Sequence, residues 1–264
     1  MDLGIAGRFA VVTGGGRGLG AEIARVLLEE GATVLVTSRS SETLLKFRGT
    51  LSKELDARAL TLVWDPTLQN LATTASAIRD AMPRVDILVN NAGDTLGVTD
   101  YLCGDEAWGS VMELNAMFPI ALNENFLPDM VAEGWGRIVN ITSVAGQENS
   151  GPVPFSTAKA ALSAYSRSMG RVLASQAQDV VMSAVFPGVV ATEGGHWDTI
   201  LKSDPARAQR YLDERVPAKR FGTEREVANT VAFYCSSLVS FSHGAIIPVD
   251  GGHAKHYLYQ NYMD

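Results

Sequence analysis

The 264-residue sequence has few residues of the kinds that define several protein classes. It contains only two cysteines, Cys103 and Cys235, which lie far apart and without metal-ligand spacing. A disulfide framework and a metal site are therefore not expected, and we interpret both cysteines as small buried hydrophobic residues. No apolar run approaches the ~20 residues of a membrane span, and no basic stretch followed by an apolar block opens the chain. We expect a cytoplasmic protein without a membrane partner.

Positive charge is also scarce. Lysine and arginine number 22 against 29 aspartates and glutamates, which gives a net charge of -7. Contacts to nucleic-acid phosphates need clustered positive charge, and no basic run occurs, so a nucleic-acid partner is not expected. Hydrophobic residues make up 46% of the chain, enough for a substantial core. The length suits one domain covering residues 1–264.

Short apolar runs alternate with longer helical patterns, as in chains that form βα units around a parallel sheet. About seven strands are expected, at Phe9–Thr13, Thr33–Thr37, Ala59–Trp64, Ile87–Val89, Arg137–Ile141, Val180–Phe186 and Ala245–Val249. Helical patterns fall between them, including Leu19–Glu30 and Ser156–Gln176. A polar, charged stretch at about 193–220 interrupts the alternation, and we interpret it as an insertion that covers a site. The pattern predicts a single α/β domain with a doubly wound parallel sheet and helices on both faces.

A glycine-rich segment, Thr13–Gly20, follows the first strand directly and opens a helix. Backbone N–H groups and the positive helix end can meet a pyrophosphate at such a turn, provided that no side chain blocks the approach. A glycine-rich turn without a ligand is the alternative interpretation. The position after the first strand favours dinucleotide binding and a Rossmann-type fold.

From this turn onward the sequence resembles the short-chain dehydrogenase/reductase family, in order and over nearly the whole chain. The matching positions are Asp65, Asn90-Asn91-Ala92-Gly93, Asn115, Ser143, Lys159, Pro187-Gly188, Thr192 and Asp250-Gly251-Gly252. The resemblance implies an oxidoreductase that moves a hydride between a nicotinamide cofactor and a small carbonyl or alcohol substrate. It also implies a homo-oligomer, dimer or tetramer, built through the Ser156–Gln176 and Glu224–Ser236 helices.

The end of the second strand indicates NADP(H) rather than NAD(H). An acid at this position would accept a hydrogen bond from a ribose hydroxyl, whereas a cation pairs with a 2′-phosphate. The strand ends Thr37-Ser38-Arg39, and Arg17 lies in the glycine turn, where an arginine can bind phosphate through two nitrogens. Solvated surface arginines are the alternative interpretation. The full set of expected cofactor contacts is Thr13, Gly14, Arg17, Gly18, Leu19, Ser38, Arg39, Asp65, Asn91, Gly93, Lys159, Pro187, Gly188 and Thr192.

Carbonyl reduction needs an oxyanion donor and a general acid beside the nicotinamide. The resemblance assigns these tasks to Ser143 and to a tyrosine one helical turn before Lys159, with Asn115 holding a water on the path to that lysine. Here the corresponding position is Phe155. Phenylalanine keeps the packing of a ring but has no proton to give, so the expected catalytic group of Asn115, Ser143, Phe155 and Lys159 lacks its acid.

Three explanations of Phe155 remain open. It can be an engineered substitution that traps a substrate complex, the natural residue of an enzyme with another proton donor, or a sign that the protein binds NADP(H) without turnover. Tyr165, on the same helix, is expected in the core. Together with Ser143 and Phe155, the insertion residues His196 and Trp197 are expected to contact substrate. An aromatic tail, with Tyr257, Tyr259 and Tyr262, is expected to pack against a neighbouring surface.

Overall fold

The sheet of the protein is parallel and doubly wound. The computed structural model describes residues 1–148, 150–177 and 179–254, and within them seven parallel strands form one sheet in the order β3-β2-β1-β4-β5-β6-β7. The strands are β1 (Phe9–Val12), β2 (Thr33–Ser38), β3 (Ala59–Val63), β4 (Ile87–Asn90), β5 (Gly136–Ile141), β6 (Val180–Pro187) and β7 (Ile246–Val249). The strand order reverses between β1 and β4, where such sheets leave a crevice for ligands.

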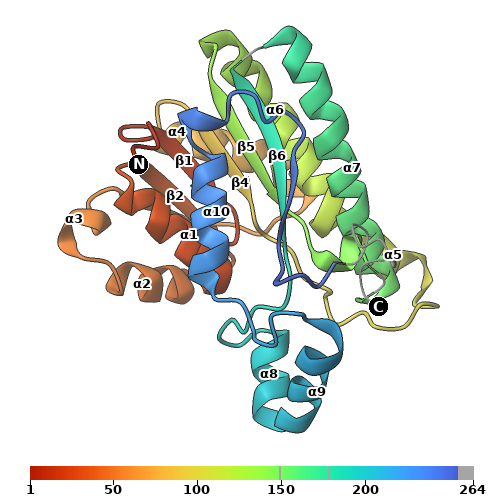
Figure 1. Cartoon of the computed structure of the whole chain (residues 1–264). Helices are drawn as coiled ribbons and strands as arrows, with labels where there is room; N and C mark the ends of the chain where they lie inside the picture. The colour runs from red at the N-terminus through yellow and green to blue at the C-terminus, as the bar shows by residue number, and fades with distance from the viewer. Residues whose placement is uncertain (149, 178, 255–264) are drawn as a thin grey trace.

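Helices cover both faces of this sheet (Figure 1). They are α1 (Gly18–Glu29), α2 (Ser41–Gly49), α3 (Lys53–Asp56), α4 (Leu71–Ala81), α5 (Gly104–Met112), α6 (Phe118–Glu133), α7 (Val153–Gln176), α8 (His196–Ser203), α9 (Pro205–Arg215) and α10 (Glu224–Tyr234). Short turns complete the elements: the 3-10 turns Leu68–Asn70, Val144–Gly146 and Ser237–Val239, and the π-helical turn Glu113–Met117. Helices α8 and α9 lie together beyond one end of the sheet (Figure 1).

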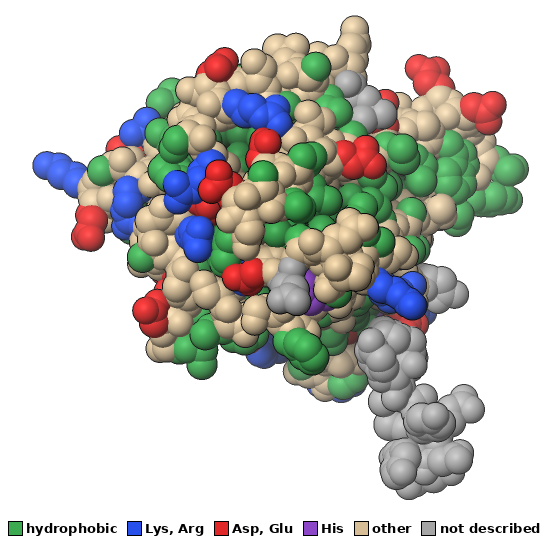
Figure 2. All heavy atoms as spheres, turned by 90° about the horizontal axis from the view of Figure 1, so that it is seen from above, with side chains coloured by type: hydrophobic (Ala, Val, Ile, Leu, Met, Phe, Trp, Pro, Cys, Tyr) green, Lys and Arg blue, Asp and Glu red, His purple; other side chains and the backbone are tan. Residues whose placement is uncertain are grey.

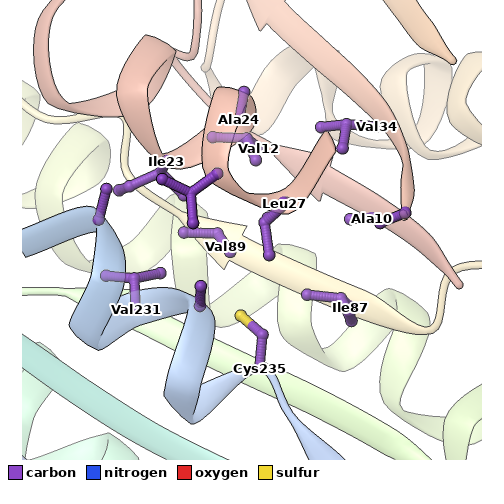
Figure 3. Close-up of a cluster of buried hydrophobic side chains, with 14 of the residues drawn as sticks. Ala10, Val12, Ile23, Ala24, Leu27, Val34, Ile87, Val89, Val231 and Cys235 are labelled. Carbon is purple, nitrogen blue, oxygen red and sulfur yellow. The ribbon is translucent and has the colours of Figure 1, made fainter. Parts of the chain in front are cut away.

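Two apolar clusters hold the layers together because the strands between the edge strands β3 and β7 are buried on both of their faces. One packs α1 and α10 on the sheet through residues such as Ile23, Leu27 and Val231 (Figure 3). The other packs α4, α6 and α7 on the opposite face. Cys235 is fully buried in the first cluster, as the sequence indicated. The same expectation was wrong for Cys103, which is only half-buried because it lies at the start of α5 near the surface.

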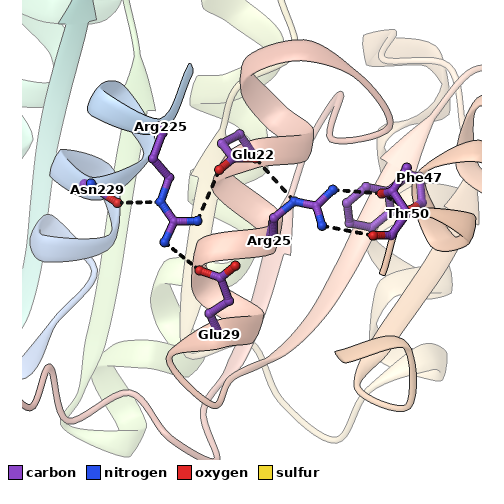
Figure 4. A network of polar contacts seen from close by, with 7 residues as sticks. All are labelled: Glu22, Arg25, Glu29, Phe47, Thr50, Arg225 and Asn229. Atoms are coloured by element: carbon purple, nitrogen blue, oxygen red, sulfur yellow. Dashed lines mark hydrogen bonds and ion pairs between the residues drawn. The ribbon is translucent and has the colours of Figure 1, made fainter. Parts of the chain in front are cut away.

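A polar network fixes α1, the helix that follows the glycine-rich turn, between its neighbours (Figure 4). Arg225 of α10 pairs with Glu22 at 3.2 Å and with Glu29 at 2.6 Å. Arg25, also on α1, donates to the carbonyl and hydroxyl oxygens of Thr50 at 3.1 and 2.8 Å. Each exposed pair contributes little alone, but together they set the position of α1 on both sides.

The observed elements match the sequence-based fold closely. Each expected strand is present with ends shifted by one residue or less, and the insertion at 193–220 forms α8 and α9. On the face in Figure 2, acidic and basic side chains lie interspersed among apolar ones. None of the helices in the described part of the chain is long and apolar enough to cross a bilayer. Residues 255–264, with the aromatic tail, lie outside the described residues.

Candidate active site

A cavity of about 940 Å³ opens where the strands end at their carboxyl edge. Most of the sequence-predicted site residues line it, although they come from distant parts of the chain. They are Gly14, Arg17, Gly18, Leu19, Ser38, Arg39, Asp65, Asn91, Gly93, Ser143, Phe155, Gly188, Thr192, His196 and Trp197. Thr13, Asn115, Lys159 and Pro187 lie behind this wall. The fold therefore brings the phosphate-binding and catalytic candidates to one cavity.

The glycine turn has the geometry of an anion site. Gly14 has φ +62°, a left-handed conformation, and a Cβ there would lie 3.0 Å from the Cα of Ala92. Helix α1 begins at Gly18 with Arg17 as its N-cap, and no hydrogen bond from the Arg17 side chain caps the first turn. Its free N–H groups and the helix dipole therefore face the cavity and can bind a diphosphate.

Thr13 supports this turn from below instead of facing the cavity. Its buried hydroxyl accepts hydrogen bonds from the N–H groups of Asn91 and Ala92, both at 3.0 Å. The Asn91 amide in turn donates to the carbonyl oxygens of Thr13 at 3.0 Å and Gly14 at 3.1 Å. These bonds tie the loop after β4 to the loop after β1 and fix the floor of the cavity.

Two cations stand at the end of the cavity beside β2. Arg17 and Arg39 are both exposed and line the cavity together with Ser38. Among the described residues, no carboxylate pairs with either guanidinium. Asp65, after β3, is exposed on the same wall. This end of the cavity can therefore accept an anionic group on a nucleoside.

Lys159 and Asn115 meet behind Gly93 at the other end. The Lys159 ammonium is buried and donates to the carbonyl oxygen of Ile141 at 2.9 Å, and burial lowers its pKa to about 8. The Asn115 amide donates to the carbonyl oxygens of Asp94 and Val111, at 2.7 and 2.9 Å. A Cβ on Gly93 would lie 2.7 Å from Asn115 Oδ1 and 2.8 Å from Lys159 Nζ, so only glycine leaves both groups in reach of the cavity.

Ser143 and Phe155 face the cavity next to this lysine. The Ser143 Oγ accepts a hydrogen bond from the Ala145 N–H at 3.1 Å, which leaves its own proton available to a ligand oxygen. The Phe155 ring is half-buried, and its centroid lies 5.7 Å from Lys159 Nζ. Next to the Lys159 ammonium, Ser143 therefore offers a hydroxyl donor, while Phe155 contributes an apolar surface.

The loop after β6 closes the cavity on the side of the glycine turn. The Gly188 N–H donates to the carbonyl oxygen of Val249, at the end of β7, over 3.0 Å. Thr192 lies opposite Gly18, since a Cβ on Gly18 would be 3.3 Å from the Thr192 Cβ. Pro187 ends β6 just before this loop.

The insertion supplies an aromatic wall. His196 and Trp197 begin α8, and the Trp197 ring packs on Tyr211 of α9 with ring centroids 4.4 Å apart. Tyr211 Oη lies 3.2 Å from Nε2 of the buried His253, and both residues line the cavity. The sequence did not identify Tyr211 as a site residue, because its only local signal was its place in the insertion. Tyr165 packs in the core as expected, and burial raises its pKa to about 12.

Comparisons with known proteins agree with this architecture. The sequence profile of the short chain dehydrogenase family matches residues 8–198. The 3-oxoacyl-[acyl-carrier-protein] reductase of Aquifex aeolicus is 34% identical over 254 residues, which cover 96% of this chain and 99% of that protein. The same enzyme of Escherichia coli is 34% identical over 250 residues, with coverages of 93% and 97%.

Solved structures are similar over the same length. L-sorbose reductase from Gluconobacter frateurii, complexed with NADPH and L-sorbose, has a TM-score of 0.86 at 30% identity and covers 97% of this chain and 99% of its own. A 3-oxoacyl (acyl-carrier-protein) reductase from Agrobacterium tumefaciens with NADP bound has a TM-score of 0.85 at 27% identity, with coverages of 95% and 95%. The chain belongs to the short chain dehydrogenase family.

Proposed function

We propose that the cavity binds NADP(H) and that the protein is an oxidoreductase that transfers a hydride between the nicotinamide and a carbonyl or alcohol substrate. One observation carries this proposal. A single cavity has Arg17 and Arg39 at one end, which have no carboxylate partner among the described residues, and the Ser143 hydroxyl beside the buried Lys159 at the other end. The NADPH and NADP complexes of the similar structures support the choice of cofactor.

The residues present fit such a cofactor. The uncapped start of α1 suits the diphosphate, and Arg17 and Arg39, with Ser38, suit a 2′-phosphate. NAD(H) is less suited, because no acid stands at the tip of β2 to accept from a 2′-hydroxyl. At the other end we place the nicotinamide half beside Asn91, Gly93, Lys159 and the loop carrying Pro187, Gly188 and Thr192. The bound cofactor would supply the hydride.

The side chains at that end would act on the substrate. Ser143 donates its hydroxyl proton in a hydrogen bond to the carbonyl oxygen and stabilises the negative charge that develops there. The Lys159 ammonium adds positive charge, and we expect it to hold the nicotinamide ribose. We infer that Phe155 occupies the position of the family's tyrosine, whether by engineering or naturally, so the proton must come from another group.

The alternative function is NADP(H) binding without turnover, which the missing proton at Phe155 favours. The two functions differ in whether any form of the site moves a hydride. Restoring a phenol by Phe155→Tyr separates them, because a general acid contributes about 10²–10⁴-fold to such a reaction.

The test combines binding with turnover. Calorimetric titration should give tighter binding of NADPH than of NADH. NADPH oxidation is then followed for the protein and for Phe155→Tyr with L-sorbose, acetoacetyl-CoA and phenanthrenequinone. Turnover by either form supports the oxidoreductase. Tight NADPH binding without turnover by either form would leave the binding function, and the absence of NADPH binding would refute both.

The cellular location and the assembly state stay predictions. A cytoplasmic homo-oligomer is expected from the family, and gel filtration at micromolar concentration measures its size. A monomer would contradict the expected assembly through α7 and α10.

A further inference from the structure

The insertion contributes a phenol, Tyr211, to the wall of the cavity that Phe155 also lines. Tyr211 lies on α9, 42 positions before His253 in the chain, yet its Oη and the His253 Nε2 are 3.2 Å apart. The two rings meet edge to face, with centroids 5.6 Å apart. Only 3% of the His253 surface is exposed, and the Tyr211 ring is also packed on Trp197. Both rings are therefore held in one orientation.

Tyr211 also reaches the segment that joins Ser143 to Phe155. Burial raises the pKa of its phenol and the nearby Ser150 side chain opposes that rise, and Ser150 and Gly151 line the same cavity as Tyr211. A Cβ on Gly151 would lie 2.8 Å from the Cβ of Ala145 and 3.7 Å from the Phe155 ring. The phenol thus lies against the part of the wall where the Phe155 ring meets the loop after Ser143.

We propose that Tyr211, backed by His253, is the catalytic proton donor for the substrate oxygen, in the place of the phenol that position 155 lacks. The proposal rests on the proposed oxidoreductase function. It names a residue of the insertion, on α9, that lines the same cavity as Phe155.

The proton transfer is balanced. As the carbonyl carbon gains a hydride, its oxygen becomes an alkoxide; the Oη–H bond of Tyr211 breaks and an O–H bond forms on the substrate. The phenolate left on Tyr211 regains its proton from water in the cavity, while the Nε2–H of His253 donates a hydrogen bond to Oη and stabilises the phenolate until then. Burial raises the pKa of Tyr211, so the phenol keeps its proton at neutral pH. An alkoxide is a stronger base than a phenolate, so the transfer remains favourable.

The test replaces one oxygen at a time. In Tyr211→Phe the ring that packs on Trp197 is kept, so NADPH affinity should stay unchanged while kcat falls at least ~100-fold, and the unfolding midpoint should fall only slightly, through the lost bond to His253. The matched control is Tyr165→Phe, which removes a phenol oxygen outside the cavity and should leave kcat unchanged. The double variant Phe155→Tyr with Tyr211→Phe should recover turnover, because it supplies a phenol at position 155 in place of the one lost at position 211.

His253→Gln removes the imidazole that hydrogen-bonds to the Tyr211 oxygen, and should lower kcat about 10-fold or more with unchanged NADPH affinity. All variants are assayed with L-sorbose, acetoacetyl-CoA and phenanthrenequinone.

The outcomes separate this proposal from the proposed function. If Tyr211→Phe has the same kcat as the parent, Tyr211 is not the donor. The same conclusion follows if the substitution changes mainly the KM for the substrate and the double variant does not recover kcat. If only forms with Phe155→Tyr oxidise NADPH, the oxidoreductase function stands and the Tyr211 proposal is overturned. If no form oxidises NADPH, the function fails and the proposal fails with it.

Discussion

Replacing the buried ammonium of Lys159 should stabilise the protein while weakening its cofactor binding. Burial lowers the pKa of Lys159 from 10.5 to about 8, which corresponds to a cost of about 3 kcal/mol for holding the charge inside the fold. In Lys159→Met that cost disappears, and the loss of the hydrogen bond to Ile141 offsets about 1 kcal/mol of the gain. We expect the variant to be about 2 kcal/mol more stable at pH 7.

The pH dependence gives the sign of the effect. Below pH 8 both folded and unfolded chains carry the Lys159 proton, so the full cost applies. Between about 8 and 10.5 the unfolded chain binds more protons, so the stability of the parent rises with pH and the advantage of Lys159→Met shrinks. Above that range the cost is absent.

Urea unfolding at pH 7 and at pH 10 measures both effects, and NADPH titration measures the affinity, which should fall about 10-fold or more. The matched control is Lys46→Met, because Lys46 is 77% exposed and pairs with Glu42 at 3.1 Å, so its change should stay below about 0.5 kcal/mol. A Lys159→Met protein that is less stable at pH 7, with NADPH affinity unchanged, would refute the reasoning and make the lysine a structural residue.

Three other changes test separate parts of the site and fold. Arg39→Ala should weaken NADPH binding about 10–100-fold and leave NADH binding unchanged, with the exposed Arg171→Ala as control; equal losses for both cofactors would contradict a 2′-phosphate contact. Gly93→Ala places a Cβ 2.7 Å from Asn115 Oδ1 and 2.8 Å from Lys159 Nζ, so thermal unfolding should show a stability loss of about 1–3 kcal/mol and titration a weaker NADPH affinity. A variant with the stability and affinity of the parent would contradict this packing. Asp179→Ala removes the carboxylate whose Oδ1 lies 2.6 Å from a guanidinium nitrogen of the buried Arg137, and urea unfolding should show a loss of about 2 kcal/mol in the unfolding free energy. An unchanged midpoint would show that the backbone carbonyl acceptors of Arg137 stabilise its charge without Asp179.

The sequence predicted the sheet, and which residues meet at the glycine-turn end of the cavity, because both depend on local patterns. The apolar runs that form β1 and β4 are bounded by polar or glycine-rich residues, and the glycine turn after β1 can be recognised from its own spacing. Parallel strands then bring their carboxyl ends to one edge, which places Ser38 and Asn91 on the same cavity.

Other features depend on packing that no local pattern encodes. The bond between Tyr211 and His253 exists because α9 packs against the turn after β7. Thr13 was expected at the cofactor, whereas the structure uses its hydroxyl to hold the loop after β4. The π-helical turn Glu113–Met117 directs Asn115 inward, although the sequence there gives no sign of an irregular helix.

Hydride transfer itself is the most direct test of the proposed function. NADPH carrying deuterium at both C4 positions is incubated with the protein, or with Phe155→Tyr, and with L-sorbose or acetoacetyl-CoA, and the alcohol is examined by mass spectrometry. The expected product carries one deuterium on the former carbonyl carbon. NADPH that is bound tightly by both forms without any deuterated alcohol would contradict the oxidoreductase and leave a cofactor-binding protein.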